Sequence, residues 1–118
     1  MDRQELEDRT MDFALRIIRL CRALPRSREG RVLGDQLLRA GTSVGANYRA
    51  SGRGRSKAEF ASKLGTVEEE ADETCFWLEL IIKAELMPRH RVQPLLQEAD
   101  ELTAIFAASV KTARPRRK

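Results

Sequence analysis

Aromatic residues are scarce in this 118-residue sequence, at 5% of the chain, and there are only one histidine and two cysteines. A core with so few aromatic side chains must be built from Leu, Ile, Val and Ala, which favours helices over strands. Four prolines and seven glycines leave long stretches without a helix-breaking residue. Because a chain of this length has room for one domain, the composition predicts a single all-helical domain.

Residues suited to catalysis or metal binding are also few. The single histidine, His90, lies between the third and fourth predicted helices and cannot supply the Glu-x-x-His pairs of a di-iron bundle. The sequence has no zinc ligand set, nucleophile elbow or phosphate-binding loop, and Gly52-Arg53-Gly54 follows no predicted strand. We therefore expect a protein that is not an enzyme and that holds no metal or cofactor.

No hydrophobic run approaches the roughly 20 residues that a membrane span needs, and the charged N-terminal segment does not form a secretory signal. Cys21 and Cys75 both lie at apolar positions of helical patterns. This placement predicts buried thiols in a reducing compartment rather than a disulfide. We expect the protein to be cytoplasmic.

Hydrophobic residues recur at helical spacing in four segments, of which the first ends at Pro25. The second spans about residues 31–51 and has Gly41 and Gly45 one turn apart in its middle. Glycine in a helix interior costs about 0.5–1 kcal/mol relative to alanine, so this pair predicts the close approach of a neighbouring helix. A weak or kinked helix would also explain the two glycines.

The third segment has the clearest pattern. It begins at the capping box Ser56-Lys57-Ala58-Glu59 and continues to about residue 86, with apolar residues alternately three and four positions apart. The fourth begins near Pro94. Four amphipathic helices joined by short connections predict an up-down-up-down four-helix bundle over residues 1–112, followed by a disordered basic tail over residues 113–118.

The chain has a net charge of +4, and two basic segments are candidates for nucleic-acid binding through phosphate contacts. The predicted residues are Arg49, Arg53, Arg55 and Lys57 at the turn between the second and third helices, and Arg114, Arg116, Arg117 and Lys118 in the tail. No aromatic residue is interleaved with them, so we expect contacts through charge and shape rather than base stacking. Alternatively, the turn is a solvated surface whose charges pair with the acidic residues 68–73 of a neighbouring helix or subunit, and the tail only keeps the protein soluble.

A further set of polar residues lies on the second and third helices. Its members are Asn47, Lys63, Glu70, Glu73 and Trp77. Lys63, Glu70 and Trp77 are spaced seven residues apart and therefore share one helix face. We interpret the set as a polar network that fixes the register of helices or subunits, not as a catalytic site, because a bundle core this narrow offers little room for a substrate.

Several of these segments together resemble a known family. Residues 36–49, 55–64, 70–74 and 77–80 closely resemble, in the same order, the four-helix-bundle family whose members are encoded within intervening sequences of bacterial large-subunit ribosomal RNA genes. The sequence is also similar to the accessory variability protein of diversity-generating retroelements. The resemblance extends over about residues 10–112, with one departure, because Ala50-Ser51 stands where the family often has Glu-Ala.

This resemblance implies a four-helix bundle that assembles as a cyclic homopentamer and binds nucleic acid, either RNA or DNA. For the retroelement branch it also implies a reverse transcriptase as partner. Together, the residues and the resemblance predict a homo-oligomeric scaffold without catalytic activity that binds nucleic acid through its basic surface. The alternative is a purely structural or protein-interaction module that does not bind nucleic acid.

Overall fold

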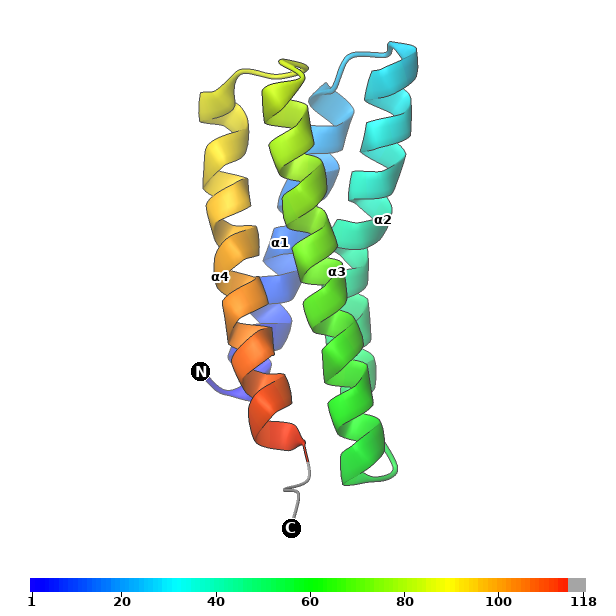
Figure 1. Cartoon of the computed structure of the whole chain (residues 1–118), viewed down its shortest axis with the longest axis vertical. Coiled ribbons are helices and arrows are strands. Elements are labelled where there is room, and N and C mark those ends of the chain that lie inside the picture. Colours follow the sequence, from blue (N-terminus) through cyan, green and yellow to red (C-terminus); the bar gives the residue numbers. More distant parts are fainter. Residues whose placement is uncertain (115–118) are drawn as a thin grey trace.

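The computed structural model describes residues 1–114 of the chain, and these residues form an all-helical bundle. The helices are α1 (Arg3–Ala23), α2 (Arg28–Ser51), α3 (Lys57–Lys83) and α4 (Arg89–Ala113). Each helix runs opposite to the one before it, so α1 and α3 point in the same direction (Figure 1). The predicted four-helix, up-down arrangement is therefore confirmed. Residues 115–118, which include most of the predicted basic tail, lie outside the described part, and α4 continues one residue beyond the predicted end of the bundle.

Three of the helices begin at a side-chain cap. The side chains of Asp2, Ser27 and Ser56 accept hydrogen bonds from the backbone N–H groups three residues further on, at 2.8, 3.2 and 3.0 Å. Each bond satisfies one N–H group that has no partner within its own helix. The cap at Ser56 was predicted from the sequence, whereas Ser27 starts α2 three residues earlier than predicted.

The start of the fourth helix was predicted wrongly. Helix α4 begins at Arg89, so Pro94 lies inside the helix and His90 lies in its first turn rather than in the preceding connection. Proline lacks the N–H group that would bond to the carbonyl four residues earlier. So close to the helix start, this removes only the bond to the carbonyl of His90, which the helix tolerates.

The third helix ends three residues before its predicted end. Glu85 adopts a left-handed backbone conformation with φ of 58°. The N–H groups of Glu85 and Leu86 then donate to the carbonyls of Ile82 and Ile81, at 3.0 and 3.2 Å. This pattern is a Schellman motif, which stops a helix by satisfying its last carbonyls.

Helix α1 is held mainly by α2, and its contacts with α4 are few. Gly41 of α2 lies against Ile17 of α1, where an added Cβ would come within 2.7 Å of the Ile17 side chain. Gly45 lies against Thr10, where an added Cβ would lie 3.2 Å from the Thr10 hydroxyl oxygen. The close approach predicted from the two glycines is therefore confirmed.

Arg9 of α1 forms ion pairs with Glu98 and Glu101 of α4 across the sparse contact between the two helices. Arg9 donates from Nε and Nη2 to the two carboxylate oxygens of Glu98, at 2.8 and 2.6 Å, and its Nη2 also lies 3.4 Å from Glu101. The paired geometry fixes the orientation of both planar groups, which a single contact would not. Arg9 thus sets the position of α1 relative to α4.

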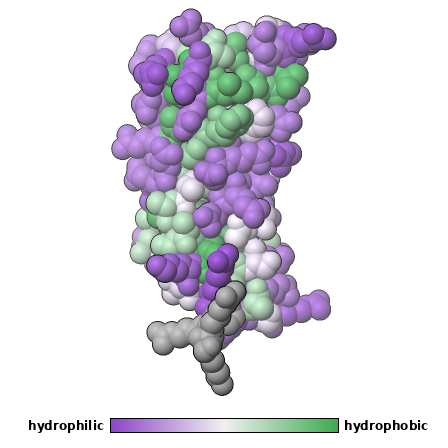
Figure 2. Space-filling model, viewed as in Figure 1, coloured by the Kyte–Doolittle hydropathy of each residue, from purple (hydrophilic) through white to green (hydrophobic). Residues whose placement is uncertain are grey.

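Most of the face formed by α3 and α4 is hydrophilic, and a hydrophobic area lies near the end at which α3 finishes (Figure 2).

Within residues 1–114, no helix has a stretch that is both long enough and apolar enough to cross a membrane.

Both cysteines are free thiols, as predicted, with Cys75 buried and Cys21 partly buried. Burial raises the pKa of Cys21 from its usual 9.0 to about 11, and that of Cys75 to about 12. The thiols therefore stay neutral in the folded chain at a pH at which unfolded thiols begin to ionise. Their contribution to stability is complete below about pH 9 and is lost as the pH rises through the raised values.

The rate at which the two thiols react tests whether burial keeps them neutral. At about pH 8, we expect Cys21 of the native chain to react with a disulfide reagent about 100-fold, and Cys75 about 1,000-fold, more slowly than in concentrated urea, because only the thiolate is a nucleophile. The Cys21→Ala variant assigns the remaining signal to Cys75. Equal rates in the native and unfolded chains would contradict the buried, neutral state.

Candidate nucleic-acid interface

The turn between α2 and α3 presents the central part of the predicted basic surface. The N–H groups of Arg53 and Gly54 donate to the carbonyls of Ala50 and Ser51, at 3.0 and 3.1 Å, and Ser56 then caps α3. These bonds fix the backbone on both sides of Arg55. The turn therefore holds its basic side chains outside the helices, where they are exposed.

Other basic residues lie at the same end of the bundle, because α4 finishes there (Figure 1). We define the basic end as the exposed residues Arg53, Arg55, Lys57, Lys111 and Arg114. Arg55 and Lys57 line one shallow hollow with Arg3 and Phe60. The predicted Arg116, Arg117 and Lys118 follow directly in the sequence but lie outside the described residues.

None of the five residues of the basic end forms an ion pair within residues 1–114. Glu70 and Glu73 of the acidic stretch pair instead with Arg39 of α2. Even the nearest member of that stretch, Glu68, is about 16 Å from Lys57 along α3, at 1.5 Å per residue. Pairing of the basic turn with the acidic stretch is therefore not seen within this chain, and the positive charges face solvent.

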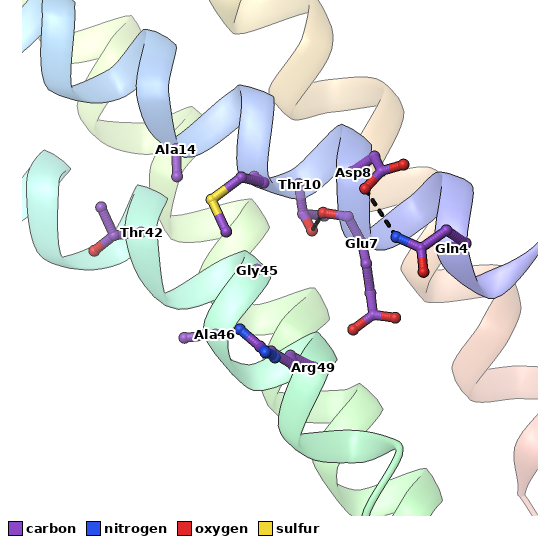
Figure 3. A pocket seen from close by; sticks show the side chains of 10 residues that line it. Gln4, Glu7, Asp8, Thr10, Ala14, Thr42, Gly45, Ala46 and Arg49 are labelled. Carbon is purple, nitrogen blue, oxygen red and sulfur yellow. Dashed lines mark hydrogen bonds between the residues drawn. The ribbon is translucent and has the colours of Figure 1, made fainter.

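The predicted Arg49 lies apart from the basic end. It lines a groove of about 670 Å³ between α1 and α2, together with Gln4, Glu7 and Asp8. Figure 3 shows the side chains of Glu7 from α1 and Arg49 from α2 on the two sides of this groove, and Gln4 donating to Asp8 at 2.9 Å. The neighbouring carboxylates make Arg49 less suited to a phosphate than the residues of the basic end.

Arg3 was missed by the sequence analysis. Its guanidinium donates to the carbonyl of Tyr48 at 2.8 Å and to the hydroxyl of Ser51 at 3.4 Å, and lies 4.6 Å from the centre of the Tyr48 ring. It thus binds the carboxyl end of α2, where the helix dipole attracts positive charge. Ser51, at the position where the sequence departs from the family pattern, is one of its partners. A basic residue among the acidic residues that begin α1 is the signal that could have indicated it.

The predicted polar set is only partly brought together. Glu73 accepts hydrogen bonds from Arg39 at 2.6 Å and from the indole of Trp77 at 3.2 Å, and Glu70 lies 3.6 Å from Arg39. The buried Oε2 of Glu70 has no hydrogen-bond partner within the described residues.

The other two members take no part in this network. Asn47 donates to the carbonyl of Ser43 in its own helix, at 2.9 Å. Lys63 is partly buried, and among residues 1–114 it forms no side-chain hydrogen bond or ion pair. Arg39, which joins α2 to α3, was missed because nothing local in the sequence indicates its partners 31 and 34 residues away.

Comparison with known proteins places the chain in a family. Residues 3–108 match the sequence model of the 23S rRNA-intervening sequence protein family, and this match covers most of the chain. The chain belongs to this family. Its basic turn lies within the matched residues, whereas Lys111, Arg114 and the tail lie beyond them.

A solved structure supports the placement of this 23S rRNA-intervening sequence protein. The chain is similar to a protein of unknown function from the S23 ribosomal protein family of Bacteroides thetaiotaomicron, with 34% sequence identity and a TM-score of 0.83. The alignment covers 89% of this chain and 97% of the other. No curated protein matches the chain.

Proposed function

We propose that this protein is a homo-oligomeric scaffold without catalytic activity that binds nucleic acid through the basic end of its bundle. The observation that supports the proposal is the cluster of exposed cations at one end, none of which is neutralised by an ion pair within residues 1–114. A nucleic-acid backbone would neutralise this charge and release its own bound counterions. The protein would recognise the charge and shape of the nucleic-acid backbone rather than its base sequence.

Assembly would strengthen such binding. The family resemblance implies a cyclic homopentamer, and in a cyclic ring all copies point the same way. With the long axis of each bundle parallel to the ring axis, the basic ends of all copies would lie on one face of the ring, so that one strand could contact several of them and bind with higher avidity. The same face would suit a nucleic-acid enzyme that works on the bound strand. A reverse transcriptase is the partner implied by the similarity to the accessory variability protein.

The proposal is tested by removing three charges from the basic end. The triple variant Arg53→Gln, Arg55→Gln, Lys57→Gln is expected to bind a labelled single-stranded RNA and a DNA duplex roughly 10- to 50-fold more weakly at ~50 mM salt. The slope of log affinity against log salt concentration should decrease in magnitude by about 2 to 3, because each lost phosphate contact reduces the magnitude of the slope by about 0.7–0.9. Fluorescence anisotropy over a salt titration measures both quantities.

A matched control removes the same charge from the other end. Arg28, Arg89 and Arg91 are exposed there, and the triple variant Arg28→Gln, Arg89→Gln, Arg91→Gln should bind nearly as well as the parent chain. An equal loss in both variants would show that total charge, not the basic end, governs binding. If the parent chain fails to bind RNA or DNA at ~50 mM salt, nucleic-acid binding is excluded. The protein-interaction module then remains, which the exposed apolar residues of the chain favour.

A further inference from the structure

Large apolar side chains are exposed on two separate faces of the bundle. The first group, which we call the aromatic patch, consists of the exposed Phe76 of α3 and Val32 of α2 together with the half-buried Trp77 and Leu80 of α3. Phe76 and Val32 are each 56% exposed.

The ion pair between α2 and α3 explains why Val32 belongs to this patch. Arg39 of α2 contacts Glu73 of α3 at 2.6 Å. Val32 lies two turns before Arg39 on the same side of α2, and Leu80 lies two turns after Glu73 on the same side of α3. Because the two helices run in opposite directions, these steps lead toward the same end of the bundle and place Val32 beside Leu80.

The aromatic patch is held rigid before any partner binds. The rings of Phe76 and Trp77 meet edge to face, with centroids 5.0 Å apart and planes at 80°. The indole N–H of Trp77 donates to Glu73, which Arg39 holds in place. Aromatic anchors with fixed orientations lose little conformational entropy on binding, and such side chains supply much of the energy at protein interfaces.

The second group, which we call the α1 strip, lies on the seam between α1 and α2. It consists of Met11, Leu15 and Ile18 of α1 and Leu38 of α2. Met11 is 58% exposed, Leu15 43% and Leu38 37%. The residues of α1 are spaced by four and three, so they form one stripe along the helix.

The seam beside the α1 strip is hollowed. Met11 shares one groove with the small residues Ala14, Gly45 and Ala46, and Ile18 and Leu38 line the next groove along the seam. Small side chains leave room for a large side chain of another molecule to enter. The strip is therefore a receptor surface in shape, whereas the aromatic patch projects.

The charges beside the Ile18–Leu38 end of the α1 strip are opposite in sign to those beside the aromatic patch, whereas the Met11 end shares its groove with Glu7, Asp8 and Arg49. Arg22, Arg26 and Arg31 line the groove that contains Ile18 and Leu38, against the single carboxylate of Asp35. At the aromatic patch, Arg39 pairs with Glu73, which leaves the carboxylates of Asp72 and Glu79 within one turn of Phe76, and Lys83 lies within one turn of Leu80. Opposite charges beside two apolar surfaces guide their encounter and disfavour contact of like surfaces.

We propose that the aromatic patch of one copy of this chain docks onto the α1 strip of the next copy. This inference rests on the homo-oligomer of the proposed function and assigns its two contact surfaces. α1 and α3 lie on diagonally opposite corners of the bundle, with no Cα atoms of the two helices within 8 Å of each other, so one molecule cannot bring its own two surfaces together. A contact between two unlike surfaces is head-to-tail, and its repetition closes a ring when the rotation between copies permits.

The test is to disrupt each surface separately and measure molar mass by light scattering at micromolar concentration. Phe76→Lys disrupts the aromatic patch and Leu15→Glu disrupts the α1 strip, and each should weaken self-association by about 30-fold or more. Both positions are exposed, so the variants should fold, which circular dichroism checks. The control Ala104→Lys alters an exposed residue of α4 outside both surfaces and should assemble like the parent chain.

Mixing the two disrupted variants identifies the head-to-tail contact. Each variant keeps one intact surface, so a mixture should form a dimer that neither variant forms alone, and nothing larger. If the Leu15→Glu variant alone still forms dimers, the aromatic patches pair with each other and the proposal is wrong. It is also wrong if the parent chain assembles and neither substitution weakens assembly.

These outcomes are separable from those for nucleic acid. Assembly that survives both substitutions removes the assigned surfaces but leaves a nucleic-acid-binding oligomer intact. A parent chain that is monomeric at micromolar concentration removes both the assigned surfaces and the homo-oligomer. Weak, salt-dependent binding of RNA by the dissociated variants would still support the basic end as the nucleic-acid site.

Discussion

Truncation of Phe106 to alanine is expected to lower the free energy of unfolding by about 3–5 kcal/mol. The ring is fully buried in α4, and its centroid lies 5.3 Å from that of Tyr48 in α2. Tyr48 lies in turn under the guanidinium of Arg3 from α1. The substitution therefore opens a cavity where three helices meet, and the lost contacts cannot be replaced by a small shift of one side chain.

Phe76 provides the matched control, because it is the same residue type at a position that is 56% exposed. In dilute solution, where assembly does not contribute, Phe76→Ala should change the free energy of unfolding by less than about 0.5 kcal/mol. Urea unfolding followed by circular dichroism measures both variants, with equal m values as the check on two-state behaviour. A loss below about 1 kcal/mol for Phe106→Ala would mean that this part of the core is not packed as described.

Substitution of Gly41 by alanine should lower the free energy of unfolding by about 1–3 kcal/mol, although alanine is the better helix former. The new Cβ would lie within 2.7 to 3.0 Å of three carbon atoms of the Ile17 side chain. Ile17 is fully buried and cannot rotate into solvent. Helices α1 and α2 would have to separate, and α1 has few other contacts to hold it.

The same substitution at Gly65 should act in the opposite direction. Gly65 lies inside α3, and an added Cβ would meet no atom within 4 Å. Gly65→Ala should therefore raise the free energy of unfolding by about 0.5–1 kcal/mol through helix propensity alone. Thermal unfolding of both variants under identical conditions gives the comparison. Stabilisation by both substitutions would contradict the close contact between α1 and α2.

Much of the fold could be predicted because helix formation is governed by local chemistry. The hydrophobic spacing of the third segment and the cap at Ser56 depend on residues within one or two turns of each other. The glycine pair in α2 also indicated its close neighbour, since a helix rarely accepts two glycines one turn apart without a packing reason. The predicted start of α4 was wrong because a proline near the start of a helix is compatible with either the first or the second turn.

The basic end could be predicted only in part. Arg53 and Arg55 were identified because they lie between two helical patterns, and Lys57 because it directly follows the cap that begins α3. Arg49 was grouped with them by proximity in sequence, but the rotation of α2 turns it into the groove beside Glu7. That rotation is fixed by the packing of Gly41 and Val44 against other helices, which a single helix pattern does not specify to within one residue.

By itself, the sequence determined four helices, the cap at Ser56, two unpaired thiols and the positive charge of the turn. All of these follow from residue type and from spacing within a few turns. The tertiary structure alone decided the partners of Arg3, Arg9 and Arg39 on other helices, which lie 31 to 92 residues away in sequence. It also decided which apolar residues of α1 and α3 stay exposed. Such pairings depend on the register and rotation of packed helices, which result from the sum of many long-range contacts rather than from any local pattern.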